Sequence, residues 1–363
     1  MTDSAEGASH PSGAEPAFPE PPPRPPLVTA ALSILAVLGS FLALLQIDIP
    51  IMRFLRSLDL SAVQRFGDFG EKLGNGGTLV TVSVVVLGLG FALKRDPLKR
   101  AAVDSLLAHG VVGLLVNGLK HLIGRPRPRL THGSDWQWWP SWETGLDSFP
   151  SGHTSSTVAV VTVLMRVLPS GRWAPFLLVA WVAASRIWRG SHFPSDVLAG
   201  LVAGFVVGSV FNAPLRWWAR SSVLAMVRIA PVAACIAGTV WVVCHRIVDP
   251  ATDIILLVSG TLLIAGGMAL RLWPQPAANG RRNITSVQLS PALTGLGFGV
   301  ATGAPVIMVL AGLVCLAWLG ASQHGEHVSA NLSHSRTHAV LRVAGSAIAL
   351  ILIQGLKGLI PLR

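Results

Sequence analysis

Three short blocks of this sequence place two histidines among cations, which is the combination that a phosphoryl-transfer site needs. The blocks are Lys120 to Pro128, Pro150 to His153, and Ser185 to Asp196. Each lies at the end of a long uncharged run, and ionisable groups near a bilayer are costly and usually functional. Cations beside histidines predict an anionic substrate and phosphoryl chemistry.

The three cations fit the charge of a phosphate group. Negative charge on the non-bridging oxygens must be held by positioned cations and backbone N–H groups. Lys120 supplies a point charge, whereas Arg127 and Arg186 supply forked donors that match phosphate geometry. Taken singly, each of these cations would be read as an interfacial anchor.

The second block predicts the start of a helix, where free N–H groups and the helix dipole favour an anion. Ser151 can add its hydroxyl to this anion site. Gly152 lets the backbone approach the substrate closely, because it has no side chain. His153 then points toward the same pocket, although alone it would be read as a capping or packing residue.

Two histidines can divide the acid and base steps of phosphate transfer. One attacks phosphorus and forms a phosphohistidine, while the other protonates the leaving oxygen and later activates water. If the third block is helical, His192 and Asp196 share a face, so the carboxylate can fix the ring tautomer and stabilise positive charge. This favours His192 as the nucleophile and His153 as the general acid, with a purely structural His192–Asp196 pair as the alternative.

The composition indicates a membrane protein. Of 363 residues, 51% are hydrophobic and only 12% are charged, compared with about 25% charged residues in soluble domains. The formal net charge of +11 comes from short loops between apolar runs, with no basic helix or tail. We therefore expect membrane lipids as partners and no nucleic acid.

The apolar runs predict about ten membrane spans, each near the roughly 20 residues that a bilayer requires. Their approximate cores are 28–46, 76–93, 101–123, 152–168, 173–188, 197–215, 224–245, 253–270, 291–319 and 339–359. The third span ends in the first block, the fourth begins at the second block, and the third block joins the fifth span to the sixth. Alternating crossings therefore bring all three blocks to one side of the membrane.

The loops on the opposite side carry many cations, which the positive-inside rule places in the cytoplasm. They are Lys94, Arg95, Lys99, Arg100, Arg172, Arg216, Arg220, Arg271, Arg281 and Arg282. The site side also carries cations, but we expect it to be extracytoplasmic.

Two segments outside the spans also have a predicted structure. Residues 1–26 predict a disordered Pro-rich tail and not a cleaved signal peptide. Residues 51–72 predict either interfacial amphipathic helices or an ordered loop.

The three blocks resemble the signature motifs of the type 2 phosphatidic acid phosphatase (PAP2) superfamily. The pattern is K-x6-RP, then PSGH, then SR-x5-H-x3-D, and all eleven fixed positions match in order. The matching residues are Lys120, Arg127, Pro128, Pro150, Ser151, Gly152, His153, Ser185, Arg186, His192 and Asp196.

The resemblance covers roughly residues 27–220 and implies a six-helix membrane core with an extracytoplasmic site, no cofactor and no metal requirement. It also implies that His192 is the nucleophile, Asp196 its support and His153 the acid. The remaining matched residues, Lys120, Arg127, Ser151, Gly152 and Arg186, then hold phosphate. Soluble vanadium haloperoxidases share this anion cradle, but the many spans argue against that branch.

Residues 221–363 depart from the family pattern and predict about four further transmembrane helices of unknown role. Glycines at 295, 297, 299 and 303 interrupt one long run, which indicates either a broken helix or close helix packing. The loop near the end, with His324, His327, His334 and His338, is expected on the catalytic side. These histidines could suit a transition metal, with solvent exposure as the alternative.

The sequence therefore predicts an all-α, polytopic lipid phosphatase of a bacterial inner membrane. It would hydrolyse a phosphomonoester or diphosphate of a lipid headgroup through a phosphohistidine intermediate, without a metal. The alternatives are a lipid-to-lipid phosphotransferase, or a transporter or scaffold whose C-terminal spans carry the function. Neither the natural lipid nor the oligomeric state follows from the sequence.

Overall fold

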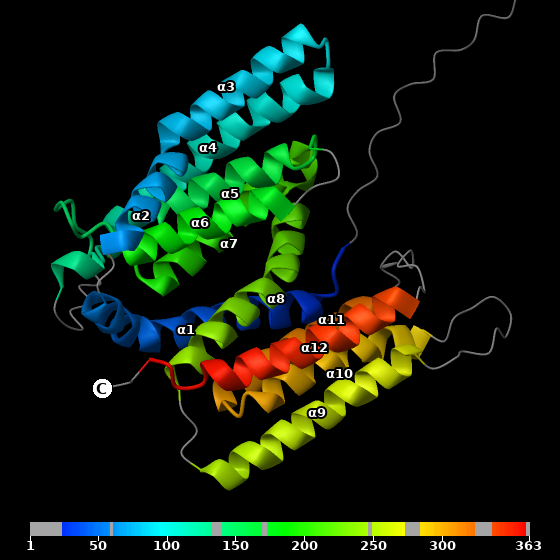
Figure 1. The fold of residues 1–363 in the computed structure, drawn as a ribbon. Coiled ribbons are helices and arrows are strands. Elements are labelled where there is room, and N and C mark those ends of the chain that lie inside the picture. Colours follow the sequence, from blue (N-terminus) through cyan, green and yellow to red (C-terminus); the bar gives the residue numbers. More distant parts are fainter. Residues whose placement is uncertain are drawn as a thin grey trace, which may run out of the picture.

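The computed structural model describes residues 24–58, 61–131, 139–168, 173–245, 249–272, 284–323 and 336–360, and this part of the chain forms a helical bundle without a strand. Its α-helices are α1 (Leu27–Ser57), α2 (Ser61–Leu73), α3 (Gly76–Ala92), α4 (Asp96–Ile123), α5 (Gly152–Leu164), α6 (Trp173–Trp188), α7 (Pro194–Phe211), α8 (Trp218–Cys244), α9 (Pro250–Leu272), α10 (Ile284–Ala301), α11 (Pro305–Gln323) and α12 (Arg336–Leu356). Two 3-10 helices, η1 (Pro128–Leu130) and η2 (Leu215–Trp217), complete the described elements. The expected all-α fold is confirmed (Figure 1).

The helices have the length and surface of membrane spans. In the described residues, five are long and apolar enough to cross a bilayer, and the bent α2–α3 pair makes a sixth if it counts as one span. Large apolar side chains lie on their outer surfaces, such as Leu114 with 77% of its surface exposed and Leu262 with 67%. Such surfaces suit lipid better than water, so the chain is an integral membrane protein.

The alternating helices bring the three blocks to one end of the bundle, on the left in Figure 1. There α4 and α6 end, while α5 and α7 begin. The α5–α7 contact is especially close, because a Cβ atom built at Gly204 would lie 2.3 Å from the carbonyl oxygen of Ser155, and one at Gly200 would lie 2.8 Å from that of Ser151. Small residues at this four-residue spacing let the two helix backbones touch and fix the second block against the third.

The first span is longer than the sequence indicated. Its apolar core was expected to end near Gln46, whereas α1 continues to Ser57 and includes Pro50. The following helix, α2, confirms the amphipathic-helix reading of this region over the ordered-loop reading. It packs on α6, where the Trp181 indole N–H donates to the carbonyl of Phe66 at 3.0 Å.

The helix α1 also joins the core to the C-terminal extension. One buried hydrophobic cluster contains Leu44 and Ile47 of α1, Trp241 of α8 and Leu310 of α11, together with Leu198 of α7. The extension is therefore packed against the first span instead of standing apart from it.

The glycine-rich run at 291–319 is a pair of helices and not a single span. Helix α10 ends at Ala301 and α11 begins at Pro305, with Gly303 between them at φ 69°. Close packing occurs as well, since a Cβ atom at Gly297 would lie 2.6 Å from the carbonyl oxygen of Gly260. The glycines therefore mark both a break between two helices and a close contact between helices, the two alternatives that the sequence left open.

The break at Gly303 also changes the end of the bundle at which α11 stops. Gly320 near the end of α11 packs against Thr29 at the start of α1, whereas the N–H of Ile360 after α12 donates to Val243 beside the end of α8. The end of α11 and the start of α12 thus lie away from the three blocks, whereas the sequence predicted that they would lie on the same side as the blocks. His324, His327 and His334 lie outside the described residues, as does the side chain of His338.

Candidate active site

Backbone hydrogen bonds hold the three blocks together. The N–H of Ser148 donates to the carbonyl of Arg125 at 2.9 Å, and the N–H of Ser151 donates to that of Asp196 at 3.0 Å. A third bond at 3.0 Å joins the N–H of Arg129 to the carbonyl of Gly190. The sequence blocks therefore form one structural unit whose side chains can act together.

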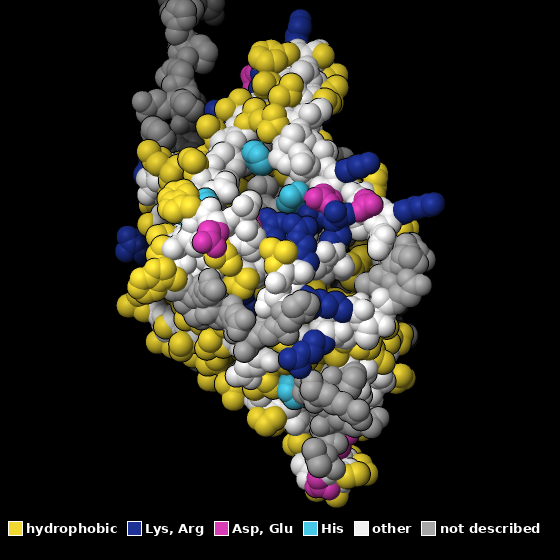
Figure 2. Space-filling view, turned by 90° about the vertical axis from the view of Figure 1, so that its left-hand side faces the viewer, with side chains coloured by type: hydrophobic (Ala, Val, Ile, Leu, Met, Phe, Trp, Pro, Cys, Tyr) yellow, Lys and Arg dark blue, Asp and Glu magenta, His cyan; other side chains and the backbone are white. Residues whose placement is uncertain are grey.

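Cationic side chains gather at the centre of this face of the molecule, with histidine and acidic side chains beside them and hydrophobic ones around them (Figure 2). Lys120 lies in the last turn of α4, and Arg127 follows that helix. Both contact Asp147, which accepts two hydrogen bonds from Arg127 at 2.7 and 2.5 Å and lies 3.7 Å from the Lys120 ammonium. The guanidinium of Arg127, which the sequence predicts to bind phosphate, is thus already paired with the carboxylate of Asp147.

Arg186 is held in the last turn of α6 and is 2% exposed. Its Nη1 lies 3.5 Å from Glu71 of α2, and its Nε donates to the Ser185 hydroxyl at 3.3 Å. Its Nη2 is buried and has no hydrogen-bond partner among the described residues. A buried donor without a partner is costly, so this nitrogen marks a position that suits an anion.

The N-terminus of α5 is open as an anion site. Ser151 occupies the N-cap position without a capping bond from its side chain, and its hydroxyl lies 3.0 Å from that of Thr154. A Cβ atom at Gly152 would lie 3.8 Å from the Lys120 ammonium, so the missing side chain leaves room beside that charge. His153 follows, and its Nε2 is buried without a partner among the described residues.

His192 is buried, with 3% of its surface exposed, and its tautomer is fixed by the backbone. Its Nδ1 lies 2.6 Å from the carbonyl oxygen of Ser148, which can only accept, so Nδ1 carries the proton and Nε2 keeps a lone pair. Burial lowers the pKa of His192 well below its usual 6.5, and the charges of Lys120 and Arg127 lower it further. The ring is therefore neutral and nucleophilic at neutral pH.

Asp196 supports His192 less directly than the sequence indicated. Helix α7 begins at Pro194, so His192 lies before the helix and the two do not share a helical face. The Asp196 carboxylate is 3.9 Å from Nδ1 of His192, and it accepts instead from the Phe193 N–H at 2.8 Å and the Ser148 hydroxyl at 2.6 Å. Ser148 is thus the bridge, because its carbonyl binds the ring and its hydroxyl binds the carboxylate.

Five further residues of the site were not singled out in the sequence: Asp48, Glu71, Arg125, Asp147 and Ser148. Asp48 had a weak signal, as an acidic residue two positions beyond the first predicted span, and ionisable residues within a span are usually functional. Arg125 had a weaker one, as a cation between two matched positions. The Ser148 carbonyl could not be predicted from the sequence, because every residue type has a backbone carbonyl. Among the described residues, no group of three or more His, Cys, Asp or Glu side chains could hold a metal ion.

The contact of Asp147 with Arg127 predicts competition with phosphate. Hydrogen bonds and charge from Arg127, with the Lys120 charge, outweigh burial and lower the pKa of Asp147 to about 2, so the carboxylate is ionised at any working pH. In Asp147→Asn the amide offers one acceptor and no charge. We expect inorganic phosphate to inhibit this variant at roughly tenfold lower concentration, a change of about 1.4 kcal/mol.

The matched control for this measurement is Asp249→Asn, which removes an exposed acid that caps α9 and contacts none of the three cations. Its inhibition by phosphate should equal that of the wild type. Weaker phosphate inhibition in Asp147→Asn would mean that the carboxylate supports the bound anion and does not compete with it.

Comparison with known proteins identifies relatives of one kind. The PAP2 superfamily profile matches residues 101–220. A lipid A 1-phosphatase of Rhizobium etli is 31% identical over 193 residues, which cover 50% of this chain and 82% of that protein. A decaprenylphosphoryl-5-phosphoribose phosphatase of Mycobacterium tuberculosis is 33% identical over 117 residues, which cover 31% of this chain and 58% of that protein.

An undecaprenyl-diphosphatase of Bacillus subtilis is 34% identical over 109 residues, which cover 28% of this chain and 52% of that protein. No solved structure matches the chain significantly. Residues 221–363 lie outside the match to the superfamily profile.

Proposed function

Because the chain belongs to the PAP2 superfamily, we propose that it is an integral membrane lipid phosphatase that hydrolyses a phosphomonoester or diphosphate at a lipid headgroup. The similar proteins are named for different lipid phosphates, one a lipid A and two of them polyprenyl derivatives. The shared chemistry is therefore a phosphate at the membrane surface, with water as the final acceptor.

In the first step, His192 would attack phosphorus through Nε2. The bond from phosphorus to the lipid oxygen breaks, and His153, whose protonated form the charge of the bound phosphate favours, gives its proton to that oxygen. In the second step, His153 takes a proton from water while the water oxygen attacks phosphorus and the bond to His192 breaks. Inorganic phosphate leaves, and both rings return to their starting states.

The single observation that carries this proposal is a pair of buried nitrogens without partners among the described residues, Nη2 of Arg186 and Nε2 of His153. The two histidines come from different elements but lie within range of the same three charges, those of Lys120, Arg127 and Arg186. Three cations, an uncapped helix start and a neutral histidine with a free lone pair match the needs of phosphoryl transfer.

The test is phosphate release from a panel of lipids, with the purified full-length protein in detergent micelles. The panel contains phosphatidate, phosphatidylglycerol phosphate, a polyprenyl diphosphate and a phosphorylated glycolipid. Release of free phosphate from at least one of these lipids is expected. Transfer of the phosphoryl group to a second lipid without free phosphate would identify a phosphotransferase instead.

We propose that the protein lies in a bacterial inner membrane with an extracytoplasmic site, and the cations of the opposite loops support this orientation. Lys94 and Arg95 between α3 and α4, and Arg216 before α8, lie at the end away from the site. In a variant without native cysteines, a membrane-impermeant maleimide should label Thr144→Cys in intact cells and Lys94→Cys only after lysis. The reverse pattern would place the site in the cytoplasm.

A further inference from the structure

Helix α1 carries a single acidic residue, Asp48, whose side chain is 0% exposed. Its carboxylate accepts from Nη2 of Arg125 at 2.7 Å, from the N–H of Ser195 at 3.0 Å and from the hydroxyl of Ser195. These partners all donate, which suits the ionised form of the acid. The first span therefore brings a negative charge into the base of the site.

Arg125 lies between this carboxylate and that of Asp196. Its Nη2 serves Asp48, while its Nη1 donates to Asp196 and to the Ser195 hydroxyl, the latter at 2.7 Å. The guanidinium carbon lies 4.0 Å from the centre of the Phe193 ring, which fixes its plane. With both carboxylates ionised, which their hydrogen-bond donors favour, this buried group carries one net negative charge.

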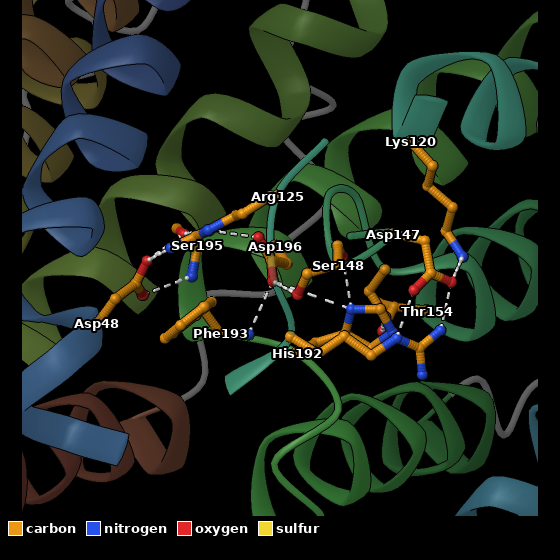
Figure 3. A network of polar contacts seen from close by, with 12 residues as sticks. Asp48, Lys120, Arg125, Asp147, Ser148, Thr154, His192, Phe193, Ser195 and Asp196 are labelled. Carbon is orange, nitrogen blue, oxygen red and sulfur yellow. Dashed lines mark hydrogen bonds and ion pairs between the residues drawn. The ribbon is translucent and has the colours of Figure 1, made fainter. Parts of the chain in front are cut away.

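The group is connected to His192, as Figure 3 shows. Asp196 accepts from the Ser148 hydroxyl at 2.6 Å, and the carbonyl of Ser148 accepts from Nδ1 of His192 at 2.6 Å. The ring of a histidine that is phosphorylated on Nε2 and protonated on Nδ1 carries a positive charge, which a nearby negative charge stabilises. If Arg125 were paired with Asp196 alone, the pair would be neutral and would stabilise a positive charge on the His192 ring only weakly.

We propose that Asp48 is a positioning residue, which shares Arg125 with Asp196 so that the Asp196 carboxylate is held in place yet incompletely neutralised beside His192. This proposal rests on the proposed phosphatase function. It makes α1, which precedes the superfamily match at 101–220, part of the catalytic machinery.

The test is Asp48→Asn in the full-length protein, assayed on the lipid of the panel that the wild type hydrolyses fastest. The substitution keeps the size of the side chain and removes its charge. We expect kcat to fall about 10- to 100-fold, the range seen when partners that orient metal-ligating histidines are lost. KM and the inhibition constant of inorganic phosphate should stay within twofold of the wild type, because Lys120, Arg127 and Arg186 are not touched.

The matched control is Asp104→Asn, which breaks the ion pair of Asp104 with Arg166 at the far end of α4 and α5. It should leave both kcat and KM at wild-type values. An Asp48→Asn variant with wild-type kcat would overturn the proposal. So would a folded variant that loses phosphate binding together with kcat, because Asp48 would then be a general scaffold.

Ser195→Ala provides a second variant if Asp48→Asn does not fold. It removes the hydroxyl that accepts from Arg125 and donates to Asp48, without leaving a buried charge unpaired. A smaller fall in kcat at unchanged KM supports the proposal, and a wild-type kcat overturns it. Failure of the phosphatase function itself is distinguishable, because the wild type would then release no phosphate from any lipid of the panel.

Discussion

His192→Ala should reduce phosphate release to the level of a mock preparation. The side chain supplies the lone pair that forms the bond to phosphorus, and it is the ring that the Ser148 carbonyl holds in place. Losses of about 10⁴-fold or more are typical when a covalent nucleophile is removed. A radioactive phosphoryl group from substrate should label the wild type in a form that is stable in alkali and lost in acid, and the variant should remain unlabelled.

His245→Ala is the matched control for this loss. His245 follows α8, stacks on Trp241 with 3.9 Å between ring centroids, and is packed without contacting the three cations. Its removal should leave phosphate release and labelling intact. A His192→Ala protein that still takes up the label would place the nucleophile elsewhere and would refute the assignment of roles to the two histidines.

His153→Ala should lower turnover of a lipid phosphomonoester by roughly 10²- to 10⁴-fold, the usual contribution of general acid–base catalysis. The buried Nε2 of His153 has no partner among the described residues, so it can face the leaving oxygen. The size of the loss should depend on the leaving group. With p-nitrophenyl phosphate, whose leaving group needs no proton, phosphorylation of the enzyme should be nearly normal.

Hydrolysis of the intermediate still needs a base, so the labelled phosphohistidine should accumulate in His153→Ala. This build-up distinguishes a lost acid–base group from a distorted site, in which both steps would slow together. His121→Ala is a suitable control, because His121 neighbours Lys120 in the chain but stacks on Trp142, with 4.2 Å between ring centroids. Equal losses with both substrates would argue against the assigned role.

The sequence predicted the meeting of the three blocks because that inference needs only a count of crossings. Long apolar runs mark the spans, alternation fixes the sides, and the blocks sit at span ends. The same method was wrong for the end of α11, because the break at Gly303 divides one apolar run into the two helices α10 and α11. The end of α11 therefore lies beside the start of α1, at the opposite end of the bundle from the three blocks.

The carboxylates around the site were harder to predict than its cations and histidines. Asp147 and Glu71 lie among ordinary polar loop and helix residues, and only the folded chain places them on Arg127 and Arg186. Asp48 was missed because the first span was expected to end near Gln46. The sequence also did not show that Ser148 holds the His192 ring, because the ring donates to a backbone carbonyl that any residue type could have provided.

Helix α1 faces two ways. One side carries Asp48 toward Arg125, and the other packs Leu44 and Ile47 among residues of α8 and α11. Close-packed neighbours transmit small displacements instead of absorbing them. A shift of α1 would therefore move Asp48 relative to Arg125, so this one helix connects the packing of α8 and α11 to the charges beside His192.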